Sequence, residues 1–99
     1  KSPAVIDPEY PTEKAVERIL FVKQFNAGQI CTNVDYVFVH ETKLQAFIHT
    51  ATAWVKAHVP DIHSHDYTSV IDERAYQRLV HTLADAEAKG ASLINLSQQ

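Results

Sequence analysis

Strand-like and helix-like segments alternate along this chain, and this alternation limits the folds that the chain can adopt. Residues 4–6 form a short apolar run, and residues 34–39 are, apart from Asp35, β-branched or aromatic, which favours strands. The second of these strands is expected to be buried on both faces. Apolar residues after each segment recur at three- and four-residue steps, the spacing of an amphipathic helix. Strands joined through helices usually pair in parallel. The sequence therefore predicts an α/β chain with mostly parallel strands.

The first helix is expected to begin at Pro11-Thr12 and to run to about Asn26. Glu13 falls in its first turn, where a carboxylate interacts favourably with the helix dipole. Gly28 is the only glycine before Gly90, so the helix should stop near it.

Two further helices have recognisable ends. Thr42 is a candidate N-cap of the second helix, and Pro60 should end it. Asp72 is a candidate N-cap of the third helix, and Gly90 is well placed to cap its other end. Residues 92–96 are predicted to form a closing strand. The expected apolar stripes are Leu44, Phe47, Ile48, Ala51, Trp54, Val55 and His58 in the second helix, and Tyr76, Leu79, Val80, Leu83 and Ala86 in the third.

The resulting plan is about three helices on two or three mostly parallel strands. Parallel strands need cover on both faces and neighbours at both edges, and so few elements provide neither. The sequence also begins at Lys1 and contains no methionine. We therefore expect these 99 residues to be part of a larger domain, cut from a longer chain.

Composition excludes several classes of function. The net charge of -3 gives no reason to expect a nucleic acid or an anionic membrane as a partner. The apolar stretches are too short to span a bilayer, and no signal-peptide pattern is visible. A single cysteine cannot form an intramolecular disulfide, so a cytoplasmic location is expected.

That single cysteine, Cys31, is the main candidate for chemistry. It follows the first helix and precedes the strand-like segment 34–39, in a corner that contains the small residues Ala27 and Gly28. Backbone N–H groups in such a corner can stabilise an oxyanion near a nucleophilic sulfur. The alternative is a small buried hydrophobic residue beside a helix-ending glycine, and position alone leaves both open.

Sequence motifs around this cysteine resemble the aldehyde dehydrogenase family. Gly-Gln-Ile-Cys at residues 28–31 resembles the family's G-Q-x-C active-site signature, and Asn26 stands two residues before its glycine. Lys-Ser-Pro at residues 1–3 resembles the end of the family's E-L-G-G-K-S-P segment, at the expected interval. The resemblance covers essentially the whole chain, and residues 30–36 are most similar to the coniferyl aldehyde dehydrogenase branch.

The resemblance implies a chemistry and a fold. The chain would be a fragment, residues 1–99, of the catalytic domain of an enzyme that oxidises an aldehyde to a carboxylic acid with NAD or NADP. Cys31 would attack the aldehyde carbon to give a thiohemiacetal and then a thioester, with its own N–H contributing to the oxyanion hole. The substrate would be a small-molecule aldehyde, with coniferyl or another aromatic aldehyde as the candidate that the branch implies, and the enzyme would form homo-oligomers, as the family usually does.

The resemblance also implies that essential groups lie elsewhere. The family's oxyanion-binding asparagine, the general-base glutamate four residues before Lys1 and the cofactor-binding domain are not among these 99 residues. No glycine-rich phosphate loop is present, so no cofactor-binding residue is assigned. The isolated chain is therefore expected to be inactive. Gln24 departs from the pattern, because the family usually has an aromatic or aliphatic residue there.

Other polar residues give weaker hypotheses. The segment His63-Ser64-His65-Asp66 contains metal-ligand side chains, but adjacent loop residues seldom close a site, so no metal is assigned. A thiol–imidazole dyad with Cys31 has no supporting spacing. The alternative to an enzyme fragment is a small α/β interaction or dimerisation module in which Cys31 is structural.

Overall fold

The computed structural model describes residues 2–97, so Lys1 of the Lys-Ser-Pro segment lies outside the described residues. Within that range the chain forms three α-helices and a two-stranded parallel sheet, which confirms the α/β prediction. The elements in chain order are β1 (Pro3–Val5), α1 (Thr12–Gln24), the 3-10 turn η1 (Phe25–Gly28), β2 (Tyr36–Phe38), the 3-10 turn η2 (Glu41–Lys43), α2 (Leu44–His58) and α3 (Glu73–Ala88).

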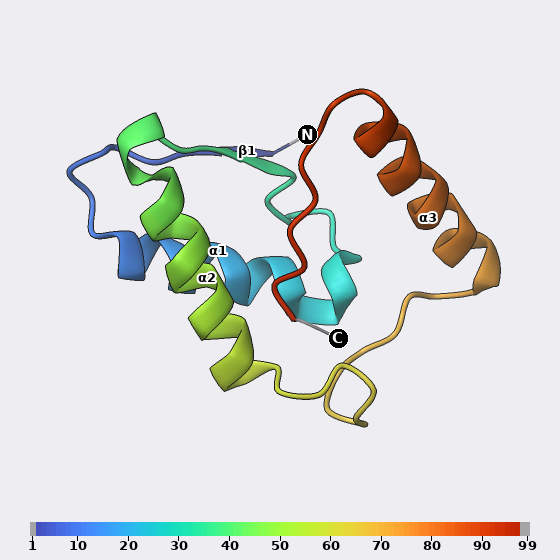
Figure 1. Cartoon of the computed structure of the whole chain (residues 1–99). Helices are drawn as coiled ribbons and strands as arrows, with labels where there is room; N and C mark the ends of the chain where they lie inside the picture. Colours follow the sequence, from blue (N-terminus) through green and yellow to red (C-terminus); the bar gives the residue numbers. More distant parts are fainter. Residues whose placement is uncertain (1, 98–99) are drawn as a thin grey trace.

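The two strands pair in parallel, and helix α1 makes the crossover between them (Figure 1). Ala4 lies opposite Val37 at the centre of the pair. Beyond the ladder, Asp35 N–H donates to Ser2 O at 2.9 Å and Ile6 N–H donates to Phe38 O at 3.1 Å. The parallel prediction is confirmed, although β2 is shorter than the expected segment 34–39.

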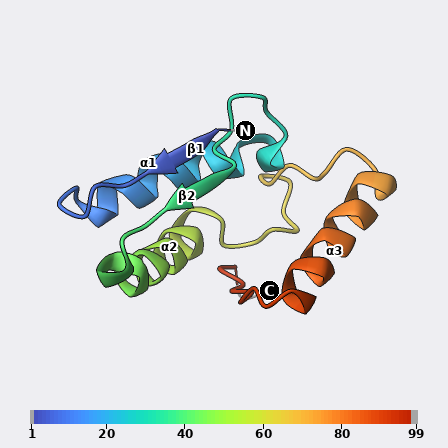
Figure 2. The ribbon, with the colours of Figure 1, turned by 90° about the horizontal axis from the view of Figure 1, so that it is seen from above.

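The expectation that this second strand is buried on both faces is wrong. Phe38 is 59% exposed and Tyr36 is 48% exposed, and their rings contact each other edge to face. A two-stranded sheet has helices on one side only, so alternate side chains of β2 face water. Figure 2 shows the pair of strands lying along α1 and α2 with no element beyond them among the described residues.

The core lies between α1 and α2 and is small. Its buried apolar side chains are Ala15 and Val16 on α1 and Ala51 on α2. Small residues at such a contact let two helices approach closely. Phe47 and Trp54, expected as core residues of α2, are each only partly buried.

Helix α1 begins at Thr12 with Glu13 in its first turn, as predicted, but it ends at Gln24, two residues earlier than expected. Helix α2 ends at His58, before Pro60, as predicted. The prediction that Thr42 caps α2 is wrong. The turn η2 precedes the helix, and His40 caps that turn, with its Nδ1 accepting from Thr42 N–H at 3.2 Å.

Helix α3 stands apart from the other helices (Figures 1 and 2). Its two predicted caps are confirmed, since Asp72 Oδ1 accepts from Ala75 N–H at 2.7 Å and Gly90 adopts a positive φ of 99°. The apolar stripe exists, but it is not covered. Tyr76, Leu79, Val80 and Leu83 are all exposed, with Leu83 at 55%.

The predicted closing strand at residues 92–96 is wrong. The described part of this segment is irregular, and it runs back toward the end of α1 rather than along a sheet edge (Figure 1). Asn95 Oδ1 accepts from Ser97 N–H at 3.0 Å, which bends the chain locally. A segment becomes a strand only when another strand supplies its hydrogen bonds, and neither β1 nor β2 lies beside it.

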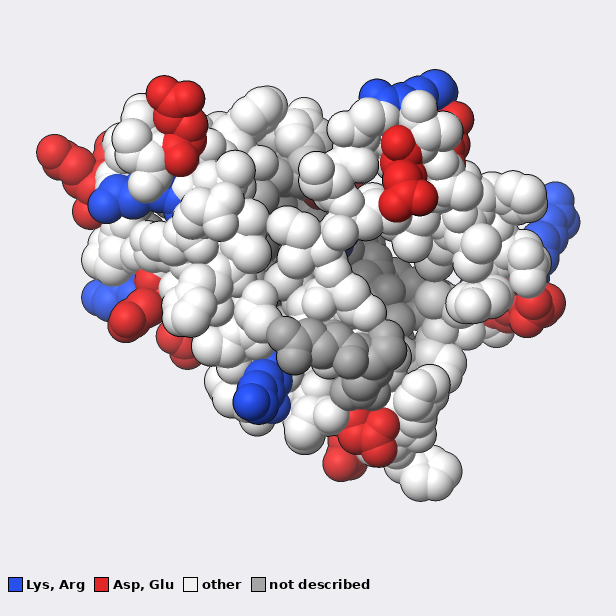
Figure 3. All heavy atoms as spheres, in the orientation of Figure 1, with Lys and Arg blue, Asp and Glu red and all other residues white. Residues whose placement is uncertain are grey.

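Charged side chains of both signs are interspersed around the face shown in Figure 3. Among residues 2–97, no helix is long and apolar enough to cross a membrane.

The Asp72 cap gives a prediction about α3. Replacing Asp72 with alanine leaves Ala75 N–H without its acceptor, so the first turn of the helix should lose about 1 kcal/mol of local stability. Hydrogen exchange of residues 73–76 should accelerate accordingly. Asp66→Ala, in the exposed loop before α3, is the matched control and should leave that exchange unchanged. Equal exchange in both variants would contradict the cap.

Candidate functional site

Cys31 lies in the connection between α1 and β2, just after the turn η1. Its side chain is exposed, so it is accessible to a reactant and is not a buried hydrophobic residue. Neither its thiol nor its main-chain N–H makes a hydrogen bond within the described residues. The sulfur and an N–H donor therefore stand together on an exposed corner, as nucleophilic attack on a carbonyl requires.

The turn before this cysteine has an unusual backbone. Asn26, Ala27 and Gly28 have φ angles of 52°, 56° and 78°, all in the left-handed region. Asparagine and glycine tolerate this region, but an alanine Cβ there costs roughly 1–2 kcal/mol. The three residues lie within η1, directly between the end of α1 and residues 29–33.

Asn33 anchors the far end of this loop. It is the one polar residue that is buried among those described, at 5% exposure, and its Nδ2 donates to Gly28 O at 2.9 Å. A Cβ built on Gly28 would lie 3.2 Å from that Nδ2 and 3.4 Å from Lys23 O. Glycine is therefore required at position 28 both for its positive φ and for the close approach of Asn33.

Gln29 anchors the near end of the loop. Its Nε2 donates to Asn26 O at 2.9 Å and to Ser69 O at 3.2 Å, and its Oε1 accepts from Ile71 N–H at 2.8 Å. In return, Asn26 Nδ2 donates to Gln29 O at 3.2 Å. The side chain thus joins the cysteine loop to the segment that leads into α3.

A third anchor joins the loop's exit to the start of the chain. Asp35 Oδ2 accepts from Ser2 N–H at 2.7 Å, and Asp35 N–H donates to Ser2 O at 2.9 Å. Ser2, near the start of the chain, is therefore bonded directly to a residue four positions after Cys31.

A cleft beside the turn η1 does not include Cys31 in its lining. It has a volume of about 580 Å³ and lies between α1, α2, α3 and the C-terminal segment, with Gln24, Gly28, Trp54, Tyr67 and Leu96 among its lining residues. The Trp54 ring stacks on His58 at a centroid separation of 4.4 Å, and its Nε1 is buried without a hydrogen-bond partner. Gln24 lines this cleft, so its departure from the family pattern affects a cavity wall and does not touch the thiol.

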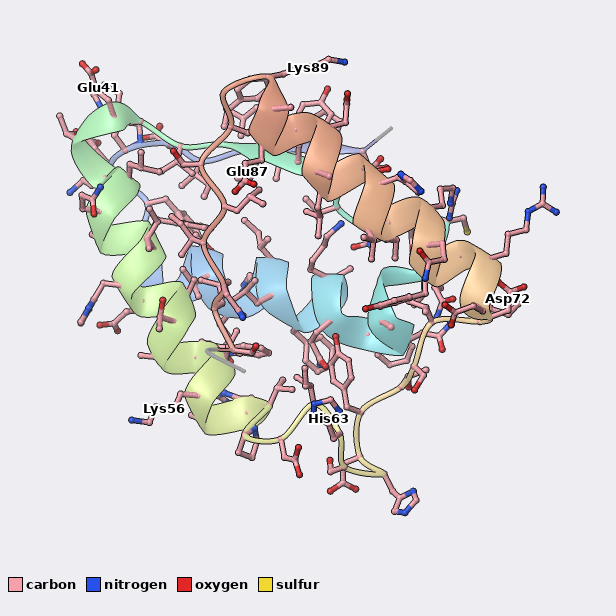
Figure 4. The ribbon with its side chains drawn as sticks, turned by 45° about the vertical axis from the view of Figure 1, so that its right-hand side comes forward. Glu41, Lys56, His63, Asp72, Glu87 and Lys89 are labelled. Carbon is pink, nitrogen blue, oxygen red and sulfur yellow. The ribbon has the colours of Figure 1, made fainter. Side chains whose placement is uncertain are left out.

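The histidine-rich loop 63–66 shows no metal site. Among residues 2–97, no group of three or more His, Cys, Asp or Glu side chains is placed to hold a metal ion. Figure 4 shows His63 on the connection between α2 and α3, well away from Glu87 and Lys89 at the end of α3. No hydrogen bond joins the Cys31 thiol to an imidazole in the described part of the chain.

Sequence reasoning located Cys31 but missed the side chains that fix its loop. The motif contains Gln29 but indicates no role for its side chain, and no sequence pattern assigns a role to Asn33 or Asp35. The sequence does contain a signal for Asn33, which lies directly after the cysteine corner and before a strand. A side-chain amide that is buried there needs a hydrogen-bond partner. The partners of Gln29 lie 40 and 42 residues away, so local sequence gives no sign of them.

Comparison with known proteins bears out the resemblance. The model of the aldehyde dehydrogenase family matches residues 1–98. The coniferyl aldehyde dehydrogenase of Pseudomonas sp. (strain HR199 / DSM 7063) is 41% identical over 98 residues, which are 98% of this chain and 20% of that relative. The probable coniferyl aldehyde dehydrogenase of Pseudomonas aeruginosa is 40% identical over 97% of this chain, again 20% of the relative.

A more distant relative is betaine aldehyde dehydrogenase 1 of Oryza sativa subsp. japonica, 29% identical over 95% of this chain and 19% of its own length. No solved structure matches. The chain belongs to the aldehyde dehydrogenase family, and it spans about a fifth of the length of the curated relatives that it matches.

The geometry at Gly28 gives a prediction. Gly28→Ala should lower the free energy of unfolding by about 2 kcal/mol, because the new Cβ meets a left-handed backbone and the buried Asn33 amide. Gly90→Ala is the matched control, since φ is also positive there but no atom lies within 4 Å, and it should cost about 1 kcal/mol. Denaturant unfolding of both variants measures the difference, and equal losses would contradict the crowding at Gly28.

Proposed function

We propose that these residues are part of the catalytic domain of an aldehyde dehydrogenase that oxidises an aldehyde to the carboxylic acid, and that Cys31 is its nucleophile. The family match over residues 1–98 supports the reaction class. The observation that carries the residue assignment is the exposed thiol beside an uncommitted N–H on an anchored turn. An aromatic aldehyde is the proposed substrate class, because two of the relatives bear the name coniferyl aldehyde dehydrogenase.

The first step follows from the groups present. The thiolate of Cys31 forms a bond to the aldehyde carbon, and the C=O π electrons move to oxygen to give an oxyanion. The main-chain N–H of Cys31 is available to donate to that oxygen and would stabilise the charge as it develops. A donor fixed in the backbone needs little reorganisation during the reaction.

Oxidation requires a hydride acceptor, which in this family is NAD or NADP. The residues described here do not fit a dinucleotide site. Both glycines of the chain have other uses, since Gly28 lies against Asn33 and Gly90 caps α3. We therefore assign the cofactor to residues outside this chain and derive no step through it.

The same reasoning makes the isolated 99 residues inactive in our proposal, because the hydride acceptor and a general base would come from other segments. Homo-oligomer formation is likewise proposed only from the family. The alternative of an interaction module with a structural cysteine is not favoured, because the family match covers nearly the whole chain and the thiol is exposed.

Substitution of the thiol tests the proposal. In the full-length protein that carries these residues, Cys31→Ala should reduce NAD(P)-dependent oxidation of an aromatic aldehyde by about a thousandfold or more, since no other group replaces the sulfur. The measurement is steady-state formation of NADH or NADPH. His65→Ala, in the exposed loop before α3, is the control and should retain full activity. Substantial activity in Cys31→Ala would refute the assignment.

A further inference from the structure

The Gln29 side chain is positioned between two segments of main chain. Its carboxamide has an acceptor oxygen, Oε1, and a donor nitrogen, Nε2, that carries two protons. All of the hydrogen bonds described for this side chain are made with backbone groups. On the side of α3, Oε1 accepts from Ile71 N–H and Nε2 donates to Ser69 O, so the amide pairs with the 69–71 backbone as a neighbouring strand would. Its remaining proton goes to Asn26 O, inside the cysteine turn.

No other hydrogen bond joins these two segments within the described residues. Ile71 is 82% exposed, so its side chain contributes almost no apolar burial to the contact. The buried apolar side chains all belong to α1 and α2, and α3 stands apart from them. Figure 4 shows the segment that leads to Asp72 passing beside the turn. There the hydrogen bonds of Gln29 with Ser69 and Ile71 join the segment to the turn.

Cys31 is therefore held between two amide anchors. Gln29 fixes the chain two residues before the thiol, and Asn33 fixes it two residues after, through its bond to Gly28 O. The left-handed backbone of residues 26–28 is costly without support, and both anchors bond to carbonyls in that turn. Release of either anchor would let the sulfur move relative to a bound substrate.

We propose that Gln29 is a positioning residue for Cys31, and that it sets the position of the thiol by clamping the cysteine turn to the 69–71 backbone. The inference rests on the proposed function, because it concerns the same reaction. Gln29 itself contacts neither the sulfur nor a reactant in this role. Since an error of about 1 Å in placing a reacting group can cost a hundredfold in rate, loss of the clamp should lower kcat and leave KM nearly unchanged.

The experiment compares variants of the full-length protein that carries these residues. Gln29→Met keeps the length of the side chain and removes all of its hydrogen bonds, whereas Gln29→Glu keeps an acceptor and removes both N–H donors. Each variant is expected to lower kcat by about tenfold or more and to leave KM within about twofold of the wild-type value. For this comparison kcat is normalised to the concentration of reactive Cys31 thiol. Gln77→Met is the matched control, because Gln77 bonds only to the exposed Glu73 side chain on α3, and its kcat should equal the wild-type value.

A second readout does not depend on activity. Ile71 N–H donates to Gln29 Oε1, so Gln29→Met should accelerate hydrogen exchange in the peptide containing Ile71 by about tenfold, and Gln77→Met should not. Unchanged exchange at Ile71, or a folded Gln29 variant that retains more than half of the wild-type kcat, would overturn the clamp. If the wild-type protein shows no Cys31-dependent oxidation, the proposed function fails and the positioning role fails with it, whatever the exchange shows.

Discussion

The hydrogen bond from the buried Asn33 amide to Gly28 O holds the cysteine corner in its conformation. Three consecutive residues there adopt left-handed angles, which a flexible chain would abandon for extended or helical ones. The bond closes the loop from the end of α1 to the approach of β2, so both elements leave the corner in fixed directions. Asn33 Oδ1 is buried and has no hydrogen-bond partner among the described residues.

Many apolar side chains in the rest of the described structure are exposed to water. The buried apolar side chains are Ala15, Val16 and Ala51, while the apolar face of α3 and the aromatic residues of β2 face water. Large exposed apolar patches are typical of surfaces that contact other protein. A chain that spans about a fifth of its relatives' length fits this picture, since the proposed remainder of the catalytic domain would supply the missing faces.

Several features that local sequence determines were predicted correctly, although the Thr42 cap was not. The caps Asp72 and Gly90 and the helix end before Pro60 depend on backbone chemistry within a few residues. Two other failures have a different cause. Residues 92–96 have a strand-like composition but no strand beside them, and Phe38 is exposed because no second layer covers it. Such outcomes depend on neighbours that a local pattern does not contain.

The candidate site was likewise predictable from the sequence only in part. The position of Cys31 follows from its motif, and its exposure agrees with a reactive role. The anchors do not follow from the motif, because Gln29 finds its partners some 40 residues later and Asp35 finds Ser2 at the start of the chain. These two contacts bring the first residues and the approach to α3 onto either side of the cysteine turn. A thiol on a loop anchored by Gln29, Asn33 and Asp35 can be exposed to a reactant and still keep a defined position, and the proposed attack on an aldehyde carbon requires this combination.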